Sequence, residues 1–325
     1  MKPFRHINVF SVEEAISTLK SNKGSAAIIA GGTDILGILK DHILTDHPEV
    51  LINIKTITGQ DYIKEDSEGL SIGSLVKLAD LAGSPLVKEK YPALAEAARS
   101  VGSPQIRNMG TIGGNLCQDT RCWYYRYPHS IGGRLLCLRK GSGPCFAVKG
   151  DNRYHAIFNG RGCFAACPSD IATALLALDA HVKTLSVGGS RVIPIEDFFN
   201  PLGKHVLEPE EMILEIRMPM PPERAKQKFL KFTVREPVDF AIVSVAALIV
   251  TAEGICTEGR IALGAIAPGP LRVSKAEEML RGKRLDPTTL QEAAEMAVKE
   301  AKPLSMNGYK VEIVKALVAR ALTEE

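Results

Sequence analysis

The cysteines are the residues of this chain whose grouping most clearly suggests chemistry. Six of the seven lie within about 50 residues, and an odd total without a secretion signal argues against a disulfide framework. Thiolates bind zinc or iron–sulfur clusters, but the spacings are wide and no C-x2-C pair occurs, which argues against a zinc ribbon. A metal site and a set of buried free thiols both remain open. The clustered cysteines are Cys117, Cys122, Cys137, Cys145, Cys163 and Cys167, and the seventh is Cys256.

A second candidate is the segment at residues 29–35, where an apolar run meets two adjacent glycines and a Thr-Asp pair. Adjacent glycines let backbone N–H groups approach a phosphate, and the start of a helix favours negative charge. The pattern is not G-x-G-x-x-G, so it does not meet the dinucleotide fingerprint, and a tight strand-to-helix turn is the favoured interpretation of the segment alone. Its residues are Ile29, Ala30, Gly31, Gly32, Thr33, Asp34 and Ile35.

A third candidate lies at residues 101–116, which hold four glycines in sixteen positions. Small polar side chains between glycines suit a loop that wraps a phosphate-bearing ligand, although a structural turn would account for them as well. Two such segments in one chain favour a dinucleotide more than either does separately. The candidate residues here are Ile106, Arg107, Gly110, Thr111, Gly113, Gly114 and Asn115.

The elements that must position these residues follow from periodicity and caps. Ser11 begins a predicted helix that runs to about residue 21, and Ser169 or Asp170 caps another that runs to about residue 180. The proline-rich break at residues 218–222 starts a new segment. We predict domains at residues 1–57, 58–222 and 223–325. Further helices are predicted at 35–40, 86–100 and from 287 onward, and strands at 26–30, 50–54, 69–73, 228–234, 241–251 and 259–265.

Composition excludes several classes of protein. The chain has 325 residues, of which 45% are hydrophobic, and a formal net charge of only +3, so it offers no strong basic field for nucleic acid. Aromatic residues make up 6%, which argues against a base-stacking surface. No apolar run of about 18 residues is long enough to span a membrane, and no apolar signal core follows the N-terminus. We therefore expect a cytoplasmic protein.

Together these motifs resemble the FAD-binding subunits of the molybdenum hydroxylases, the group of xanthine dehydrogenase and carbon monoxide dehydrogenase. The resemblance covers essentially the whole chain. It is carried, in this order, by residues 30–34 (Ala-Gly-Gly-Thr-Asp), 106–116, 168–170 (Pro-Ser-Asp) and 260–268. The ordered set is far more specific than a single glycine-rich segment.

The resemblance implies an α+β fold. Two N-terminal subdomains, of the vanillyl alcohol oxidase type, would hold FAD between them, and a C-terminal domain would pair an antiparallel sheet with helices. Residues 30–34 and 110–115 would wrap the FAD pyrophosphate. Asp170 would lie beside the adenosine half of the flavin and Lys231 near its isoalloxazine ring, with Asp239 as a further candidate. On the residues alone, Asp170 could be a helix cap and Lys231 an exposed strand residue.

One departure from the simpler family members is an insertion of about fifty residues, 117–167, before Pro-Ser-Asp. This resembles the branch of 4-hydroxybenzoyl-CoA reductase and certain bacterial aldehyde oxidoreductases, in which the insertion binds a 4Fe–4S cluster. The resemblance implies that the ligands are Cys122, Cys137, Cys145 and Cys163. Cys167 is the reserve for the fourth position and His155 the third choice. We interpret Cys117 as a packed thiol in a strand and Cys256 as a turn residue without a role.

The same resemblance implies an electron-transfer subunit. The chain lacks molybdopterin machinery and the paired cysteine patterns of a 2Fe–2S subunit, so it should not convert the organic substrate alone. Expected partners are a molybdopterin-binding large subunit, a 2Fe–2S small subunit and an external carrier such as ferredoxin or NAD. The substrate would be an aromatic acyl-CoA, an aldehyde or an N-heterocycle. The alternatives are a scaffold subunit without FAD and a stand-alone FAD oxidase of the vanillyl alcohol type.

Overall fold

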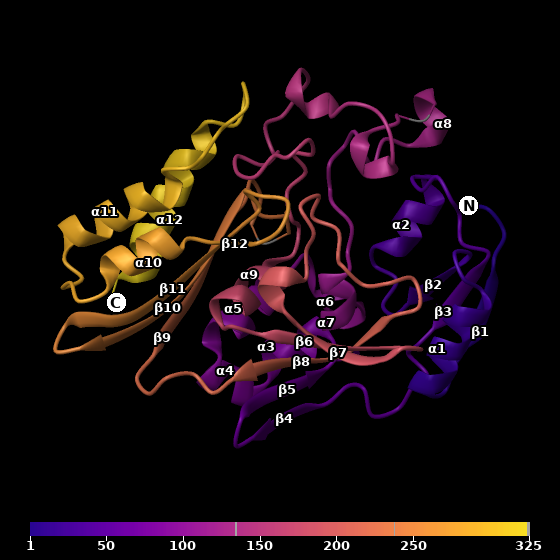
Figure 1. The fold of residues 1–325 in the computed structure, drawn as a ribbon, viewed down its shortest axis with the longest axis horizontal. Coiled ribbons are helices and arrows are strands. Elements are labelled where there is room, and N and C mark those ends of the chain that lie inside the picture. The colour runs from indigo at the N-terminus through magenta and orange to yellow at the C-terminus, as the bar shows by residue number, and fades with distance from the viewer. Residues whose placement is uncertain (134, 237, 324–325) are drawn as a thin grey trace.

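Three sheets organise the chain in the computed structural model, which describes residues 1–133, 135–236 and 238–323 (Figure 1). The first sheet is parallel, with the order β1-β3-β2. Its helix α1 begins as predicted, because the Ser11 hydroxyl accepts the Glu14 N–H. These elements are β1 (Arg5–Asn8), α1 (Val12–Ser21), β2 (Ala26–Ile29), α2 (Ile35–Lys40) and β3 (Val50–Asn53).

The second sheet is antiparallel, with the order β4-β5-β8-β6-β7. The single helix predicted at 86–100 is divided at Tyr91, because Pro92 has no N–H to continue the hydrogen-bond ladder. The strands are β4 (Ile63–Asp66), β5 (Gly69–Gly73), β6 (His181–Ser186), β7 (Gly189–Pro194) and β8 (Met212–Pro219), followed in the same region by the short η3 (Ile195–Asp197). The helices are α3 (Leu78–Gly83), α4 (Pro85–Lys90), α5 (Pro92–Ser100), α6 (Pro104–Met109), α7 (Ile112–Leu116) and α9 (Asp170–Ala177).

The third sheet is antiparallel, with the order β12-β11-β10-β9. Alternate residues of its strand β10 enter different cores: Val245 and Ala247 pack with the C-terminal helices, whereas Ala246 and Leu248 pack with α5 and α9. Burial on both faces explains why this strand is apolar throughout. The elements are β9 (Lys226–Phe232), β10 (Val243–Ala252), β11 (Ile255–Gly264), β12 (Leu271–Arg272), α10 (Ser274–Leu280), α11 (Pro287–Val298) and α12 (Tyr309–Leu322).

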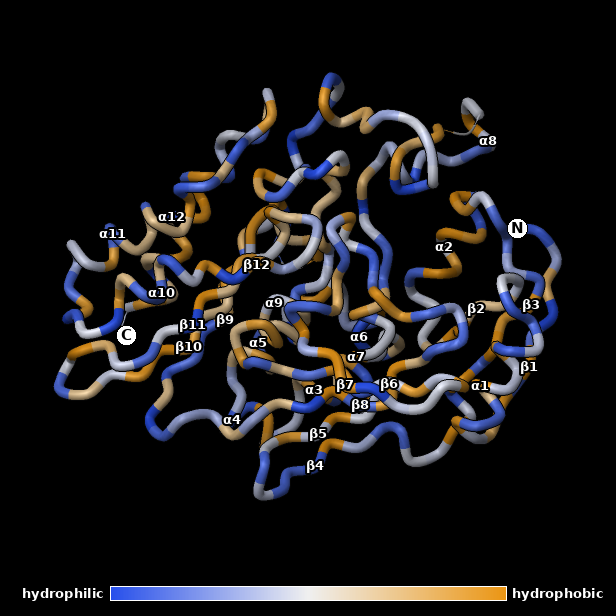
Figure 2. Tube along the Cα trace, in the orientation of Figure 1, coloured by the Kyte–Doolittle hydropathy of each residue, from blue (hydrophilic) through white to orange (hydrophobic). Residues whose placement is uncertain are grey.

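The insertion at residues 117–167 forms a loop-rich band along one edge of the molecule, from the side of α2 towards the C-terminal domain (Figure 1). Its only regular pieces among the described residues are α8 (His129–Gly132), η1 (Leu138–Lys140) and η2 (Phe146–Val148). Figure 2 shows that apolar and polar stretches alternate along this band. Two of its apolar residues, Ile157 and Phe158, pack in the core of the C-terminal domain.

Buried polar side chains fasten its second half to the C-terminal domain. The Asn152 amide donates to the carbonyls of Ala147 and Gly150 and to the Ser305 hydroxyl, at 3.0–3.2 Å. From the other side, the Asn307 amide donates to two carbonyls of the insertion, those of residues 155 and 156. Both asparagines are fully buried. This segment is thus an integral part of the molecule.

The predicted fold class is confirmed: an α+β chain with an antiparallel C-terminal sheet backed by helices. Several local predictions were wrong. The glycine-rich segment at 101–116, expected as a loop, contains α6 and α7, since Ser103 and Thr111 each cap a short helix. Cys117 ends α7 and does not lie in a strand, and Cys256 lies in β11 and not in a turn. Helix α10 was not predicted.

No helix in the described part of the chain is both long and apolar enough to cross a bilayer.

Candidate functional site

A cavity of about 300 Å³ lies where the two glycine-rich segments meet the start of α9 and the third sheet. We call it the flavin cavity, after the cofactor that the resemblance leads us to expect. Its wall combines residues far apart in the sequence, which is the arrangement expected of a ligand site between domains. The lining residues are Thr33, Asp34, Gly37, Leu78, Val101, Gly102, Ser103, Ile106, Gly110, Thr111, Gly114, Asn115, Gln118, Arg121, Arg126, Pro168, Asp170, Lys231, Val238, Asp239 and Phe240.

The two glycine-rich segments pack directly on one another. A Cβ on Gly31 would lie 2.0 Å from the Met109 carbonyl oxygen, so only glycine fits there. Gly32 has a φ of +74°, which side chains rarely adopt. In the second segment the Thr111 hydroxyl accepts the Gly114 N–H at 3.1 Å. The close approach needs glycine, and it shapes one wall of the cavity from backbone.

The structure divides the residues predicted to hold a cofactor into two groups. Nine line the cavity: Thr33, Asp34, Ile106, Gly110, Thr111, Gly114, Asn115, Asp170 and Lys231. The others support it from behind: Ile29, Ala30, Gly31, Gly32, Ile35, Arg107 and Gly113. Arg107, for example, donates to the carbonyls of Val101 and Gly102 at 3.0 and 2.8 Å, which fixes the turn before α6.

Asp170 and Lys231 form a buried ion pair of 2.7 Å on the cavity wall. Ser169, not Asp170, caps α9, and Lys231 is not exposed, so neither structural alternative from the sequence holds. Burial raises the pKa of Asp170, although the Lys231 charge opposes that shift. The structure brings these two predicted residues into contact, and which half of a flavin each of them meets stays a prediction.

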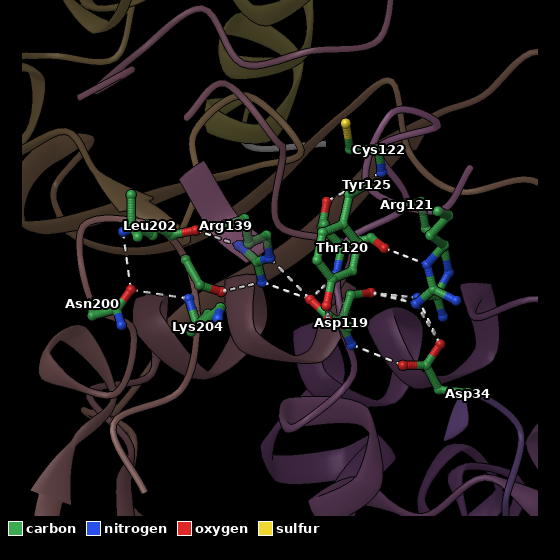
Figure 3. Close-up of polar contacts among 12 residues, drawn as sticks. Asp34, Asp119, Thr120, Arg121, Cys122, Tyr125, Arg139, Asn200, Leu202 and Lys204 are labelled. Carbon is green, nitrogen blue, oxygen red and sulfur yellow. Dashed lines mark hydrogen bonds and ion pairs between the residues drawn. The ribbon is translucent and has the colours of Figure 1, made fainter. Parts of the chain in front are cut away.

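Residues of the insertion reach the same cavity, which the sequence did not predict. The Asp34 carboxylate accepts Arg121 at 2.8 Å and Arg126 at 2.7 Å through one oxygen, and the Asp119 backbone N–H at 2.8 Å through the other. Figure 3 shows Asp34 beside Arg121 and Asp119. The Arg121 guanidinium also lies over the Phe240 ring, 4.6 Å from its centre. The first glycine-rich segment is therefore bound to the insertion through Asp34.

Asp119 continues this network away from the cavity. Its carboxylate accepts the nearly fully buried Arg139 at 2.7 and 3.0 Å and also the Tyr125 hydroxyl. Arg139 in turn donates to the carbonyl of Leu202, so the network ends in the loop before β8 (Figure 3). Burial alone would raise the pKa of Asp119, but the Arg139 charge and these hydrogen bonds hold it below its usual range. The first half of the insertion is thus anchored by charges.

Cys122, Cys137, Cys145 and Cys163 lie in one neighbourhood of the insertion. The pKa of Cys122 is raised to about 11, mainly by burial and in smaller part by the charges of Cys163 and Cys145. Burial raises the pKa of Cys163 too, with added effects from Cys145 and Cys137. Cys122 and Cys137 also share a small apolar cluster with Tyr125. Each of the four thiolates would therefore feel at least one of the others.

Within the described ranges, no three His, Cys, Asp or Glu side chains stand close enough together to hold a single metal ion. The ligands of a four-iron cluster surround a larger core, so they lie further apart than the ligands of one ion.

The remaining cysteines have other surroundings. Cys167 donates its backbone N–H to the Ala267 carbonyl. The pKa of its thiol is raised to about 11, mainly by burial and in smaller part by the charge of Asp170. Burial raises the pKa of Cys117 to about 12, as expected of a packed thiol. Cys256 is buried under the C-terminal helices.

His155 lies beside the cysteine group. Its Nε2 is 3.3 Å from the Cys122 sulfur, and its Nδ1 is buried without a hydrogen-bond partner. Burial and the Lys310 charge lower its pKa to about 4, so the ring is neutral near pH 7. The sequence named His155 only as a third choice of ligand.

Two family models match the chain in sequence. Residues 2–221 match the FAD binding domain in molybdopterin dehydrogenase, and residues 228–325 match the CO dehydrogenase flavoprotein C-terminal domain.

Similar proteins span nearly the same length. The aldehyde oxidoreductase FAD-binding subunit PaoB of Escherichia coli (strain K12) is 36% identical over 332 residues, covering 100% of this chain and 98% of that relative. The nicotinate dehydrogenase FAD-subunit of Eubacterium barkeri is 30% identical, covering 90% and 84%. The solved carbon monoxide dehydrogenase of Hydrogenophaga pseudoflava matches with a TM-score of 0.77 at 28% identity, covering 99% and 96%. The chain therefore belongs to the FAD-binding subunits of the molybdenum hydroxylase family and is an oxidoreductase subunit.

Proposed function

We propose that this chain is the electron-transfer subunit of a heteromeric molybdenum hydroxylase and holds FAD in the flavin cavity. The observation that carries this proposal is the cavity itself, whose wall combines both glycine-rich segments with the Asp170–Lys231 pair. FAD, when bound, exchanges electron pairs with one partner and single electrons with another. The proposed partners are a molybdopterin-binding large subunit and a 2Fe–2S small subunit, and the large subunit would select an aromatic acyl-CoA, an aldehyde or an N-heterocycle.

The residues of the cavity suit a flavin dinucleotide. Backbone at Gly110 and Gly114 faces the space directly, because neither position carries a side chain. The apolar side chains of Leu78, Ile106 and Phe240 offer surfaces for a ring system. A scaffold subunit without FAD would have no need of this combination of apolar wall and glycine backbone.

We also propose that the insertion binds a 4Fe–4S cluster through Cys122, Cys137, Cys145 and Cys163. The four sulfurs fit the group by chemistry, because cysteine sulfur is the usual ligand of such clusters and the charges of these cysteines act on one another. Such a cluster supplies one-electron transfer when bound. We prefer Cys163 to Cys167 as fourth ligand because the charges of Cys145 and Cys137 act on Cys163, whereas Cys167 is repelled by the charge of Asp170 and is not influenced by another of the described cysteines.

The outer face of the insertion suits an electron-carrier protein with an acidic surface, such as a ferredoxin. The insertion holds eight Lys and Arg against two Asp and Glu. Arg121, Arg126 and Arg139 are bound to Asp34 and Asp119, and the outer face includes the exposed Lys149, Arg153 and Arg161. Exposed Lys149 and Arg161 lie in the chain near cluster cysteines, as do the exposed apolar side chains of Leu136 and Val148. Complementary charge accelerates such encounters at low salt.

Electron transfer between this chain and an acidic ferredoxin should slow as the salt concentration rises. Lys149→Glu should remove part of that salt dependence.

The test of both cofactors is a visible spectrum and an iron count on protein isolated without oxygen. We expect flavin bands and about four irons per chain. Iron should be lost in Cys122→Ser and Cys163→Ser but kept in the controls Cys167→Ser and Cys256→Ser. Flavin without iron would make the four cysteines structural. Iron lost in Cys167→Ser and kept in Cys163→Ser would change the fourth ligand, and absence of flavin would refute FAD binding.

A further inference from the structure

The flavin cavity has an excess of positive charge at the end formed by the first glycine-rich segment. Arg121 and Arg126 both line the cavity there, and both bind the same oxygen of Asp34. The carboxylate of Asp119, whose backbone N–H donates to Asp34, is bound by Arg139. Three guanidinium groups therefore share two carboxylates in a partly buried network.

The other charges of the cavity wall do not correct this excess. Asp170 is bound by Lys231 in a buried pair, and Asp239 is bound by the exposed Arg235 at 2.7 Å. A partly buried cation without its own counter-ion is costly, which favours an anionic ligand at this place. A diphosphate carries negative charge and several acceptor oxygens, and guanidinium groups bind phosphate through paired N–H donors.

The position of the arginines also fits a diphosphate. Asp34 follows Thr33 at the end of the first glycine-rich segment, and Gly110 and Gly114 lie on the wall of the same cavity. The side chains of Arg121 and Arg126 are 26% and 20% exposed, so they remain accessible from the cavity while held by Asp34. The Arg121 side chain is also fixed by Gln118, whose oxygen accepts its Nη2 at 3.0 Å.

From these contacts we infer that the insertion supplies two arginines, Arg121 and Arg126, that bind the diphosphate of the flavin. The inference rests on the proposed function, since it needs FAD in this cavity. It gives the insertion a second role besides holding cysteines. Because Arg121 directly precedes Cys122, one short stretch of backbone joins the flavin site to the cysteine group.

The experiment compares two ligands on the full chain freed of flavin. FAD carries the diphosphate and riboflavin does not, and quenching of flavin fluorescence measures the affinity of each. Arg121→Gln with Arg126→Gln should weaken FAD about 10- to 100-fold, as expected for lost charged hydrogen bonds, and leave riboflavin unchanged. Arg161→Gln, which removes an exposed arginine of the same insertion, is the matched control and should change neither affinity.

Equal weakening of FAD and riboflavin would overturn the inference, since the arginines would then only shape the cavity. Unchanged FAD affinity would overturn it too. If the double variant does not fold, Arg121→Lys and Arg126→Lys keep the charge for Asp34 but lose the paired donors, so FAD should weaken several-fold and riboflavin should not. Failure of the unaltered chain to bind FAD would instead refute the proposed function.

Discussion

The flavin cavity and the insertion beside it acquire their order in different ways. In the cavity, backbone packs on backbone, as where Gly31 touches Met109, and the side chains involved are small. In the described part of the insertion, few residues are helical and none forms a strand. Buried polar side chains such as Asn152 and Arg139 hold the insertion in place by donating hydrogen bonds to carbonyls and carboxylates. Both kinds of order join residues far apart in the sequence: Gly31 meets Met109 through backbone, and Asn152 meets Ser305 through a side chain.

This difference has a consequence for mutation. A close backbone contact admits only glycine, so one methyl group should disturb the cavity and leave the insertion intact. A buried asparagine satisfies several distant backbone groups, so its removal should disturb the insertion and leave the cavity intact. The cavity and the half of the insertion that is fastened to the C-terminal domain should therefore fail separately, with FAD reporting on the first and iron on the second.

The largest effect is expected for Gly31→Ala. The new Cβ would lie 2.0 Å from the Met109 carbonyl oxygen, and backbone must move to relieve that overlap. We expect a loss of about 3 kcal/mol in the free energy of unfolding and loss of bound FAD. Chemical denaturation and flavin content measure the two. Gly83→Ala is the matched control, since nothing lies within 4 Å of a Cβ there; a similar loss in that variant would show that any added methyl group is harmful.

The second effect concerns Asn152→Ala in the insertion. The substitution leaves the Met306 N–H and the acceptors of the lost amide without partners in a buried site. We expect about 2 kcal/mol of destabilisation and loss of iron with FAD retained. Arg153→Ala next to it removes only an exposed ion pair with Asp151 and should change stability by a few tenths of a kcal/mol. Joint loss of iron and FAD would mean that the two regions are not separate.

The same contrast explains what the sequence could predict. The fold class followed from the family resemblance, and the cavity residues Thr33, Asp34, Gly110, Thr111, Gly114 and Asn115 followed from the short motifs that carry it, because glycine turns act over a few residues. The ends of β2, α2 and β3 were predicted to within one residue for the same reason. The two short helices at 104–116 were missed, because α7 contains two glycines and α6 is only six residues long, too short to show a helical period.

The polar network could not be predicted. Asp34 was assigned to a glycine loop, and no local pattern indicates that its partners are Arg121 and Arg126, some ninety positions later. The roles assigned to Asp170 and Lys231 were separated for the same reason, although the two form one ion pair. Long-range pairs between charged residues follow from tertiary packing, which periodicity does not report.

The third prediction uses pH to examine how the insertion is joined to the C-terminal domain. The fully buried Lys310 donates to the carbonyls of Tyr154 and Ala265, and burial lowers its pKa from 10.5 to about 7. Between those two values the unfolded chain binds a proton that the folded chain does not, so stability rises with pH. We expect a gain of about 1 kcal/mol from pH 7 to pH 8, measured by denaturation.

Lys310→Met should abolish this gain, because the methionine has no proton to lose. Lys302→Met removes an exposed lysine nearby and should keep the gain. An equal pH dependence in both variants would mean that another group causes it. A wild-type chain whose stability falls over this range would contradict the sign of the Lys310 shift itself.

The smallest effect is expected for His155→Ala, which tests how finely the insertion controls the proposed cluster. The ring is neutral because its pKa is lowered to about 4, and it has one N–H to donate. The Cys122 sulfur lies 3.3 Å from Nε2 and accepts that N–H in the tautomer that carries the proton there. A hydrogen bond to a ligand sulfur stabilises the reduced, more negative cluster, so its removal should lower the midpoint potential of the cluster while iron and FAD stay bound.

His129→Ala, at an exposed site in α8, is the control and should leave the midpoint potential unchanged. Loss of iron to the same extent as in Cys122→Ser would make His155 a ligand, and an unchanged potential would mean that the ring only fills space beside the sulfur.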